Sequence, residues 1–178
     1  MMIVAVMIFN RQLGFILLEV GLSRTKFSRN VLQKNLGVTF VCILGFWAIG
    51  YSLSINAEGG FIGAAYRLRL GVKDYYREIL VATSFCTTSS LIVSGCVAER
   101  MFTETYLAFT FLMVTLIYPI CSSWVWGGGW LSEIGFKDFA GSGVVHMLGG
   151  FSGLLMTVML GPRLGFGSKI SKYSIGKA

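Results

Sequence analysis

The only histidine of the chain, His146, lies in the apolar stretch FKDFAGSGVVHMLGG at residues 136–150. An imidazole changes its protonation state near neutral pH, so it can take a proton from a bound acid and return it. Asp138 stands eight residues earlier, directly before the apolar run, where an aspartate caps a helix. At about 1.5 Å per residue, the imidazole would lie about 12 Å inside a membrane, near its midplane.

A histidine at that depth is costly unless it is hydrogen-bonded or lines a cavity. A structural bond to a neighbouring helix and a functional role therefore both remain open on residue type alone. Asn10, Arg11, Gln12 and Glu19 raise the same question in the first apolar run. Such groups face a bundle interior or a protein partner rather than lipid, and Arg11 needs an anion, a carbonyl or water within reach.

These side chains need helices to hold them in lipid. The chain has 178 residues, of which 54% are hydrophobic and 13% charged, whereas soluble domains carry about a quarter charged residues. A membrane-crossing helix needs about 20 apolar residues. Five runs meet that length, at residues 1–22, 36–55, 79–97, 106–126 and 139–160. We predict an all-α polytopic membrane protein with five transmembrane helices in one domain over residues 1–178, ending in a basic tail at 161–178.

The basic residues predict an orientation. The loop after the first helix, residues 98–105 and the tail together hold nine basic residues, and the opposite side holds five. The positive-inside rule then places the first loop and the C-terminus on the inner side. The net charge of +7 lies next to the membrane and favours anionic lipids as a partner, with no nucleic acid.

The residue pattern carries no signal for an enzyme, a metal site or a cofactor. No nucleophile stands with a base, and no glycine-rich phosphate loop is present. The four cysteines fall inside predicted helices without C-x-x-C spacing, which predicts packing rather than a metal site or disulfides. They are Cys42, Cys86, Cys96 and Cys121.

Six segments, in this order, resemble signatures of the ammonium transporter family of the Amt, Mep and Rh type. They are QLGFILLEVG (12–21), GYSL (50–53), LIVSGCVAER (91–100), YPICSSWVWGGGWL (118–131), DFAGSGVVHMLGG (138–150) and GPRLG (161–165). The resemblance covers nearly the whole chain. It implies the fold of the family's first five helices, which form one of two halves related as an inverted repeat.

The resemblance also implies roles for single residues. His146 matches the first of the family's paired pore histidines, Phe85 a gate residue, and Trp126 a tryptophan of the outer recruitment site. Asp138 matches the acidic residue that holds that site's architecture. The physics is consistent, because an aromatic face attracts a small cation by about 0.5–2 kcal/mol.

Plainer interpretations of these residues stay open. Trp126 has the type of an interfacial anchor and Phe85 that of a packing residue, while Asp138 favours a simple cap over contact with substrate. Gly149 and Gly153 form a small-xxx-small pair, which predicts a close helix crossing.

The chain also departs from the family. Val81 and Ala82 stand where the family usually has an aromatic residue and a glutamine, and Arg11 is unusual beside the helix-one glutamine. Only the first half of the family's fold is present in these residues.

The leading hypothesis is a structural or accessory subunit of a larger membrane complex that does not conduct alone, with other membrane subunits as partners. Its membrane would be the mitochondrial inner membrane, with the plasma membrane as the alternative. The alternative function is an ammonium or ammonia channel completed by a second-half chain.

Overall fold

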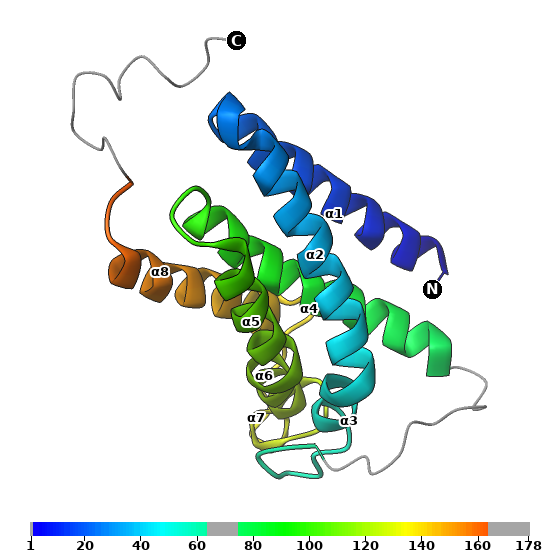
Figure 1. Ribbon diagram of the computed structural model, residues 1–178. Helices are drawn as coiled ribbons and strands as arrows, with labels where there is room; N and C mark the ends of the chain where they lie inside the picture. The colour runs from blue at the N-terminus through cyan, green and yellow to red at the C-terminus, as the bar shows by residue number, and fades with distance from the viewer. Residues whose placement is uncertain (1, 64–74, 164–178) are drawn as a thin grey trace.

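The structure is a computed structural model that describes residues 2–63 and 75–163. Every element in this part of the chain is helical, and together they form five rods (Figure 1). The rods are α1 (Met2–Leu22); α2 (Ser28–Gly45) continued by η2 (Phe46–Gly50) and α3 (Tyr51–Ser54); α4 (Tyr75–Val97); α5 (Thr103–Leu112) continued by η3 (Met113–Ile117) and α6 (Tyr118–Val125); and η4 (Ser142–Met147) continued by α8 (Leu148–Leu160). The segments η2, η3 and η4 are π-helical, η1 (Thr25–Phe27) is a 3₁₀ turn, and α7 (Trp130–Glu133) is a short helix.

The length and composition of these rods fit a membrane. Four helical stretches are long and apolar enough to cross one, at Thr25–Ser54, Tyr75–Val97, Thr103–Glu133 and Ser142–Leu160. The first rod, α1, has 21 residues, which at about 1.5 Å each reaches across about 30 Å of hydrocarbon. The chain is therefore a multi-pass integral membrane protein with the all-α fold that the sequence predicts.

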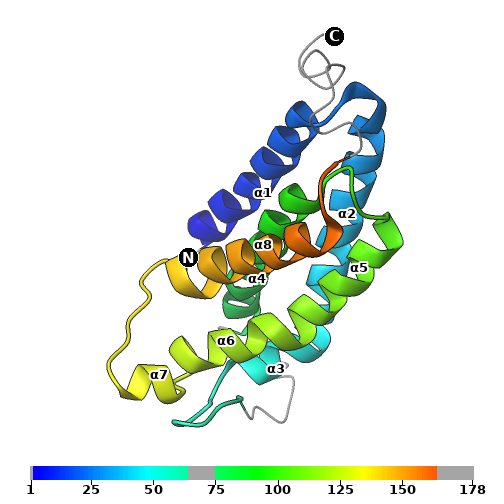
Figure 2. The same cartoon turned by 90° about the vertical axis from the view of Figure 1, so that its left-hand side faces the viewer.

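The core of the bundle is built around α4, which lies against α1, α2 and α8 (Figures 1 and 2). Its buried face carries serine and threonine side chains, among them Ser84, Thr87 and Ser94. Large apolar side chains point outward, such as Leu17 on α1 and Met159 on α8. This distribution is typical of a membrane protein. The outward apolar side chains face lipid, and the small buried residues let the helices approach closely.

Two glycines of α8 lie at its crossing with α4. A Cβ added at Gly149 would come within 2.9 Å of the Ser89 carbonyl oxygen, and one added at Gly153 within 2.7 Å of the Cys96 sulfur. Neither position has room for a side chain without a shift of the neighbouring helix. The two glycines therefore set how closely the fifth rod packs on the third.

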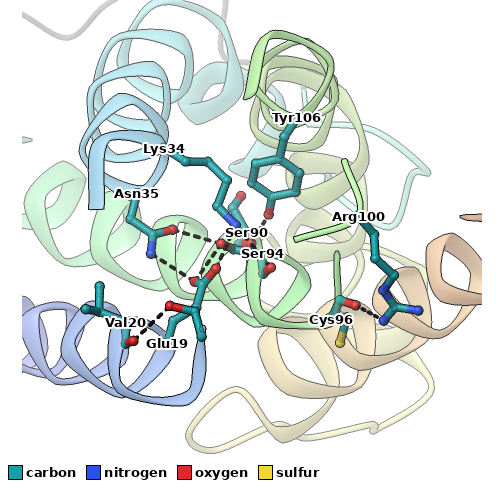
Figure 3. A network of polar contacts seen from close by, with 10 residues as sticks. Glu19, Val20, Lys34, Asn35, Ser90, Ser94, Cys96, Arg100 and Tyr106 are labelled. Carbon is teal, nitrogen blue, oxygen red and sulfur yellow. Dashed lines mark hydrogen bonds and ion pairs between the residues drawn. The ribbon is translucent and has the colours of Figure 1, made fainter. Parts of the chain in front are cut away.

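The second rod begins at Ser28, eight residues before the predicted start at 36. The hydropathy prediction left out the basic residues before position 36, but in the structure Arg29 is exposed and Lys34 is paired inside the bundle. Lys34 Nζ donates to Glu19 Oε1 at 2.6 Å, and Asn35 Nδ2 donates to Glu19 Oε2 at 2.9 Å (Figure 3). The partner that Glu19 needs in the membrane is thus a buried lysine of the neighbouring helix.

The same network extends to α4 and α5. Ser94 Oγ donates to Glu19 Oε2 at 2.7 Å, and the ammonium of Lys34 lies 5.2 Å from the ring centroid of Tyr106. The Tyr106 hydroxyl donates to the Ser90 carbonyl (Figure 3). Four helices are therefore joined through one buried ion pair.

A second ionic cluster joins three segments at one end of the bundle. Glu99 accepts hydrogen bonds from the backbone N–H of Arg24 at 2.6 Å and from its Nε at 3.0 Å, and Arg163 Nη1 lies 3.8 Å from Glu99 Oε2. Burial raises the pKa of Glu99, but hydrogen bonds from Arg24 and the charges of Arg24 and Arg163 outweigh it, so the net shift is downward.

This cluster shows that the first loop, the turn after α4 and the segment after α8 share one end of the bundle. The sequence predicted that arrangement from its basic residues. Which side of the membrane this end faces stays a prediction. The basic residues predicted for the opposite side at 67, 69 and 73, and the tail beyond 163, lie outside the described residues.

Candidate aromatic cation site

Phe85 and Trp126 meet at the end of the bundle opposite the Glu99 cluster. Their ring centroids are 5.5 Å apart and their planes are inclined by 51°. Both rings line an open cavity of about 300 Å³. Its other lining residues include Glu78 on α4, Tyr118 and Ser122 on α6, and Phe139. The lining is mostly apolar, with π faces available to a small cation.

Trp126 is held in place by the loop that follows it. Its indole Nε1–H donates to the backbone carbonyl of Asp138 at 2.8 Å. The Asp138 carboxylate in turn accepts the backbone N–H groups of residues 141–144, at 2.8–3.0 Å. Gly141 has a φ of +91°, which a glycine adopts at little cost. This turn directs four N–H groups onto one carboxylate.

The helix begins at Ser142 with Gly141 as its N-cap residue, rather than directly after Asp138 as the sequence predicted. Asp138 still satisfies the N–H groups at the helix start and so has a capping and positioning role. Its side chain is 8% exposed and is not part of the cavity lining. Burial raises the pKa of Asp138, but the four backbone hydrogen bonds together lower it by more, so the net shift is downward. The carboxylate is charged at neutral pH, and both of its oxygens accept backbone N–H groups of the turn.

The two departures from the family pattern also lie at the cavity. Val81 and Ala82 line it, each about one helical turn before Phe85. The wall that an aromatic residue would supply is aliphatic here. The aromatic side chains that line the cavity are Phe85, Tyr118, Trp126 and Phe139.

Sequence reasoning missed Glu78, an exposed carboxylate at the same cavity. The Tyr51 hydroxyl donates to its Oε2 at 3.2 Å. The helical spacing from Glu78 through Val81 and Ala82 to Phe85 places these residues on one face of α4. That spacing was the signal available in the sequence. Arg77 also lines the cavity, so its lining carries one acidic and one basic side chain.

His146 lies apart from the aromatic cavity. It belongs to η4, its backbone N–H donates to the Gly141 carbonyl at 2.9 Å, and its side chain is exposed on the described surface. It is absent from the cavity lining. The structure thus brings Phe85 and Trp126 together, places Asp138 behind Trp126, and leaves His146 on a separate face. π-helical turns such as η4 occur frequently at functional sites.

Arg11 approaches Phe85 from α1. Its Nη2 donates to Thr88 Oγ1 at 2.6 Å, and its Cζ lies 5.9 Å from the Phe85 ring centroid. The neighbouring Gln12 donates from Nε2 to the Ser84 carbonyl at 3.3 Å. The sequence predicted an anion, a carbonyl or water as the partner of Arg11, whereas the structure gives it a hydroxyl group and an aromatic ring of α4.

The fold and the cavity define a multi-pass helical membrane protein with an aromatic pocket toward one end of the bundle. The chain matches the sequence model of the Ammonium Transporter Family over residues 1–178, and it belongs to that family. This confirms the resemblance on which the sequence prediction rested.

Individual relatives agree with this assignment. Ammonium transporter Amt2 of Archaeoglobus fulgidus is 40% identical over 168 residues, which are 86% of this chain and 36% of that protein. Ammonium transporter 1 member 3 of Solanum lycopersicum is 34% identical over 176 residues, 90% of this chain and 38% of that protein. A solved structure described as Sensor Amt Protein superposes with a TM-score of 0.85 at 32% identity, over 91% of this chain and 43% of that chain. The chain spans a little more than a third of the length of these curated relatives.

Proposed function

We propose that this chain forms one wall of an ammonium pathway and recruits ammonium at the cavity between Phe85 and Trp126. The observation that carries the proposal is the contact of these two rings, with centroids 5.5 Å apart, at an open cavity of about 300 Å³. An ammonium ion is small enough to lie within about 6 Å of both ring faces, where the attraction is strongest.

Two carboxylates support this role in different ways. Glu78 lies at the cavity, which Arg77 also lines, and its carboxylate is the group of the described lining that attracts a cation. Asp138 stays out of the cavity and fixes Trp126 through its backbone carbonyl. Attraction and ring geometry therefore depend on separate residues.

His146 is the proton-handling group of the proposed pathway. Its imidazole is exposed on the described bundle, and in this proposal the wall that faces it comes from further polypeptide. In the completed assembly the imidazole would line a narrow passage, where it can accept a proton from ammonium or hydrogen-bond to ammonia. A second-half chain that carries a matching histidine would complete this passage.

Two features of the cavity favour a second function, that of an accessory subunit without independent conduction. Arg11 places a fixed guanidinium at Phe85, and Val81 and Ala82 leave one wall of the cavity aliphatic. Both features weaken a cation site. In this second proposal the chain packs in a larger membrane complex, with the mitochondrial inner membrane as its location.

A comparison of two tryptophans tests the first proposal. Trp126 and Trp130 are 38% and 40% exposed, but only Trp126 lines the cavity. The native assembly would be purified gently, its polypeptides identified by mass spectrometry, and methylammonium uptake measured after reconstitution into vesicles. Trp126→Leu should lower uptake by about 2-fold to 30-fold, the loss of one cation–π contact, and Trp130→Leu should not.

Each outcome has a distinct meaning. Uptake that depends on Trp126 supports recruitment at the cavity. An assembly of unrelated subunits whose vesicles take up no methylammonium would overturn recruitment and support the accessory role.

A further inference from the structure

We infer that Arg11 is a selectivity residue: its fixed positive charge at Phe85 opposes cations that move past the aromatic cavity and leaves uncharged ammonia unopposed. This inference rests on the proposed function, because it concerns the same pathway. It adds a residue from α1 to a site whose other members come from the second, third and fourth rods and the loop after the fourth.

The position of the guanidinium is fixed by α4. Arg11 Nη2 donates to Thr88 Oγ1 at 2.6 Å. The Thr88 hydroxyl donates its own proton to the Ser84 carbonyl at 2.8 Å, so its lone pairs face the guanidinium. Because Thr88 is fully buried, this anchor is shielded from competition by water. The charge is therefore held one turn from Phe85 rather than left on a free side chain.

The positive charge of Arg11 is not neutralised within the described residues. Glu19 is paired with Lys34, and Glu99 with Arg24 and Arg163. No carboxylate of residues 6–63 or 75–163 forms an ion pair with Arg11. Its Nε is buried without a hydrogen-bond partner in the same part of the chain. An arginine stays protonated in proteins, so the site retains a full positive charge.

The Phe85 ring lies next to Arg11 and also lines the cavity in which a substrate cation would bind. The Phe85 ring contacts Trp126 at the cavity and also lies 5.9 Å from Arg11 Cζ. A cation that moves from the cavity along Phe85 must approach a resident cation on that ring. The repulsion is stronger in a membrane-embedded bundle than in water, because the surroundings screen it less. A neutral base meets no such barrier.

A structural arginine would behave differently. If Arg11 only ties α1 to α4, its removal should lower stability and leave the ratio of cation to ammonia transport unchanged. If it sets selectivity, its removal should change that ratio. The two effects are measured separately.

The test uses the native assembly reconstituted in vesicles. Ammonium-induced current reports the movement of charge, and internal alkalinisation reports the entry of neutral ammonia. Arg11→Met removes the charge at similar length and should raise the current at least about tenfold without a matching rise in ammonia entry, since one uncompensated charge at close range supplies an effect of that size. Arg11→Lys keeps the charge and should give a much smaller rise. Arg29→Met removes an exposed basic residue of α2 and serves as the matched control.

A second variant keeps the inference testable if Arg11→Met fails to assemble. Thr88→Val removes the anchor and keeps the charge, so the guanidinium gains freedom and the current should rise about twofold. A current that stays at the wild-type level in each assembled variant, with ammonia entry still present, overturns the inference and leaves the proposed function standing. Vesicles in which neither wild type nor any variant moves ammonium or ammonia overturn both.

Discussion

Trp126 donates its indole N–H to the backbone carbonyl of Asp138 at 2.8 Å, so the aromatic wall of the cavity is fastened to the turn that opens the fifth rod. The carboxylate of the same aspartate accepts four backbone N–H groups of that turn. The geometry of the cavity and the start of η4 are therefore not independent.

Replacement of Asp138 should affect both stability and the aromatic pair. In Asp138→Ala the four N–H groups lose their acceptor, and we expect a loss of about 2 kcal/mol, at the upper end of the range for helix caps. Thermal unfolding in detergent measures the loss, and tryptophan fluorescence reports the movement of Trp126. Asp138→Asn keeps one acceptor oxygen and should lose less. Equal melting temperatures for wild type and Asp138→Ala would contradict this role.

The lowered pKa values of Asp138 and Glu99 predict sensitivity to acid. A carboxyl group whose folded-state pKa lies below its ordinary value stabilises the fold above that value, about 4, and loses the contribution as the pH falls through the folded pKa. The melting temperature in detergent should therefore be level from pH 7 to about 5 and fall below about 4. Asp138→Asn should show a shallower acid decline than wild type. An identical decline in the variant would exclude Asp138 as a contributor.

The buried pair of Glu19 and Lys34 should be far more sensitive to loss of one partner than of both. Lys34→Met leaves Glu19 charged and unpaired among buried groups, a change that typically costs about 3–5 kcal/mol. The double variant Glu19→Gln, Lys34→Met removes both charges and should recover most of the loss. Unfolding in detergent compares the two. A double variant as unstable as Lys34→Met would show that the hydrogen bonds to Asn35 and Ser94, rather than the uncompensated charge, dominate.

Variants of Gly149 and His146 should affect different properties, assembly in the first case and ammonium flux in the second. Gly149→Leu would drive a side chain against the Ser89 carbonyl and Ile92, because even a Cβ would lie 2.9 Å from that oxygen. We expect loss of the native assembly in this variant on non-denaturing gels. His146→Ala removes an exposed side chain and should assemble normally while ammonium flux falls. Normal assembly of both variants, with flux intact in His146→Ala, would contradict both expectations.

Glu78 should contribute to recruitment through long-range attraction. Glu78→Gln keeps the side-chain shape and removes the charge, so half-saturating methylammonium should rise about twofold to threefold at low salt. The difference should shrink at about 1 M salt, where the Debye length is about 3 Å. Glu104→Gln removes an exposed carboxylate at the start of α5 and is the control. A change that persists at high salt would point to direct contact instead.

Much of the fold follows from the sequence, because each rod is an apolar run of membrane length. The boundary of the second rod does not. Hydropathy excludes Arg29 and Lys34, whereas pairing with Glu19, in another helix, makes Lys34 compatible with burial. A one-dimensional pattern carries no information on which charged residues of different helices meet.

The candidate site shows the same limit. Family motifs indicated Phe85, Trp126, Asp138 and His146, and the structure joins the first two. The contact of Arg11 with Phe85 depends on how α1 packs against α4, which no local spacing encodes. Glu78 was overlooked because it lies outside the six segments that resemble the family, although its helical spacing to Phe85 was visible.

The hydroxyl groups of α4 have a consequence for biogenesis. Ser84, Thr87 and Thr88 each donate to a carbonyl one turn earlier in the same helix. Their donor protons are thus satisfied within α4, independently of any other helix. A hydroxyl group that is already hydrogen-bonded costs less to transfer from water into an apolar medium. These three hydroxyl groups therefore add little to the cost of inserting α4 into the bilayer, although the helix lies at the centre of the finished bundle.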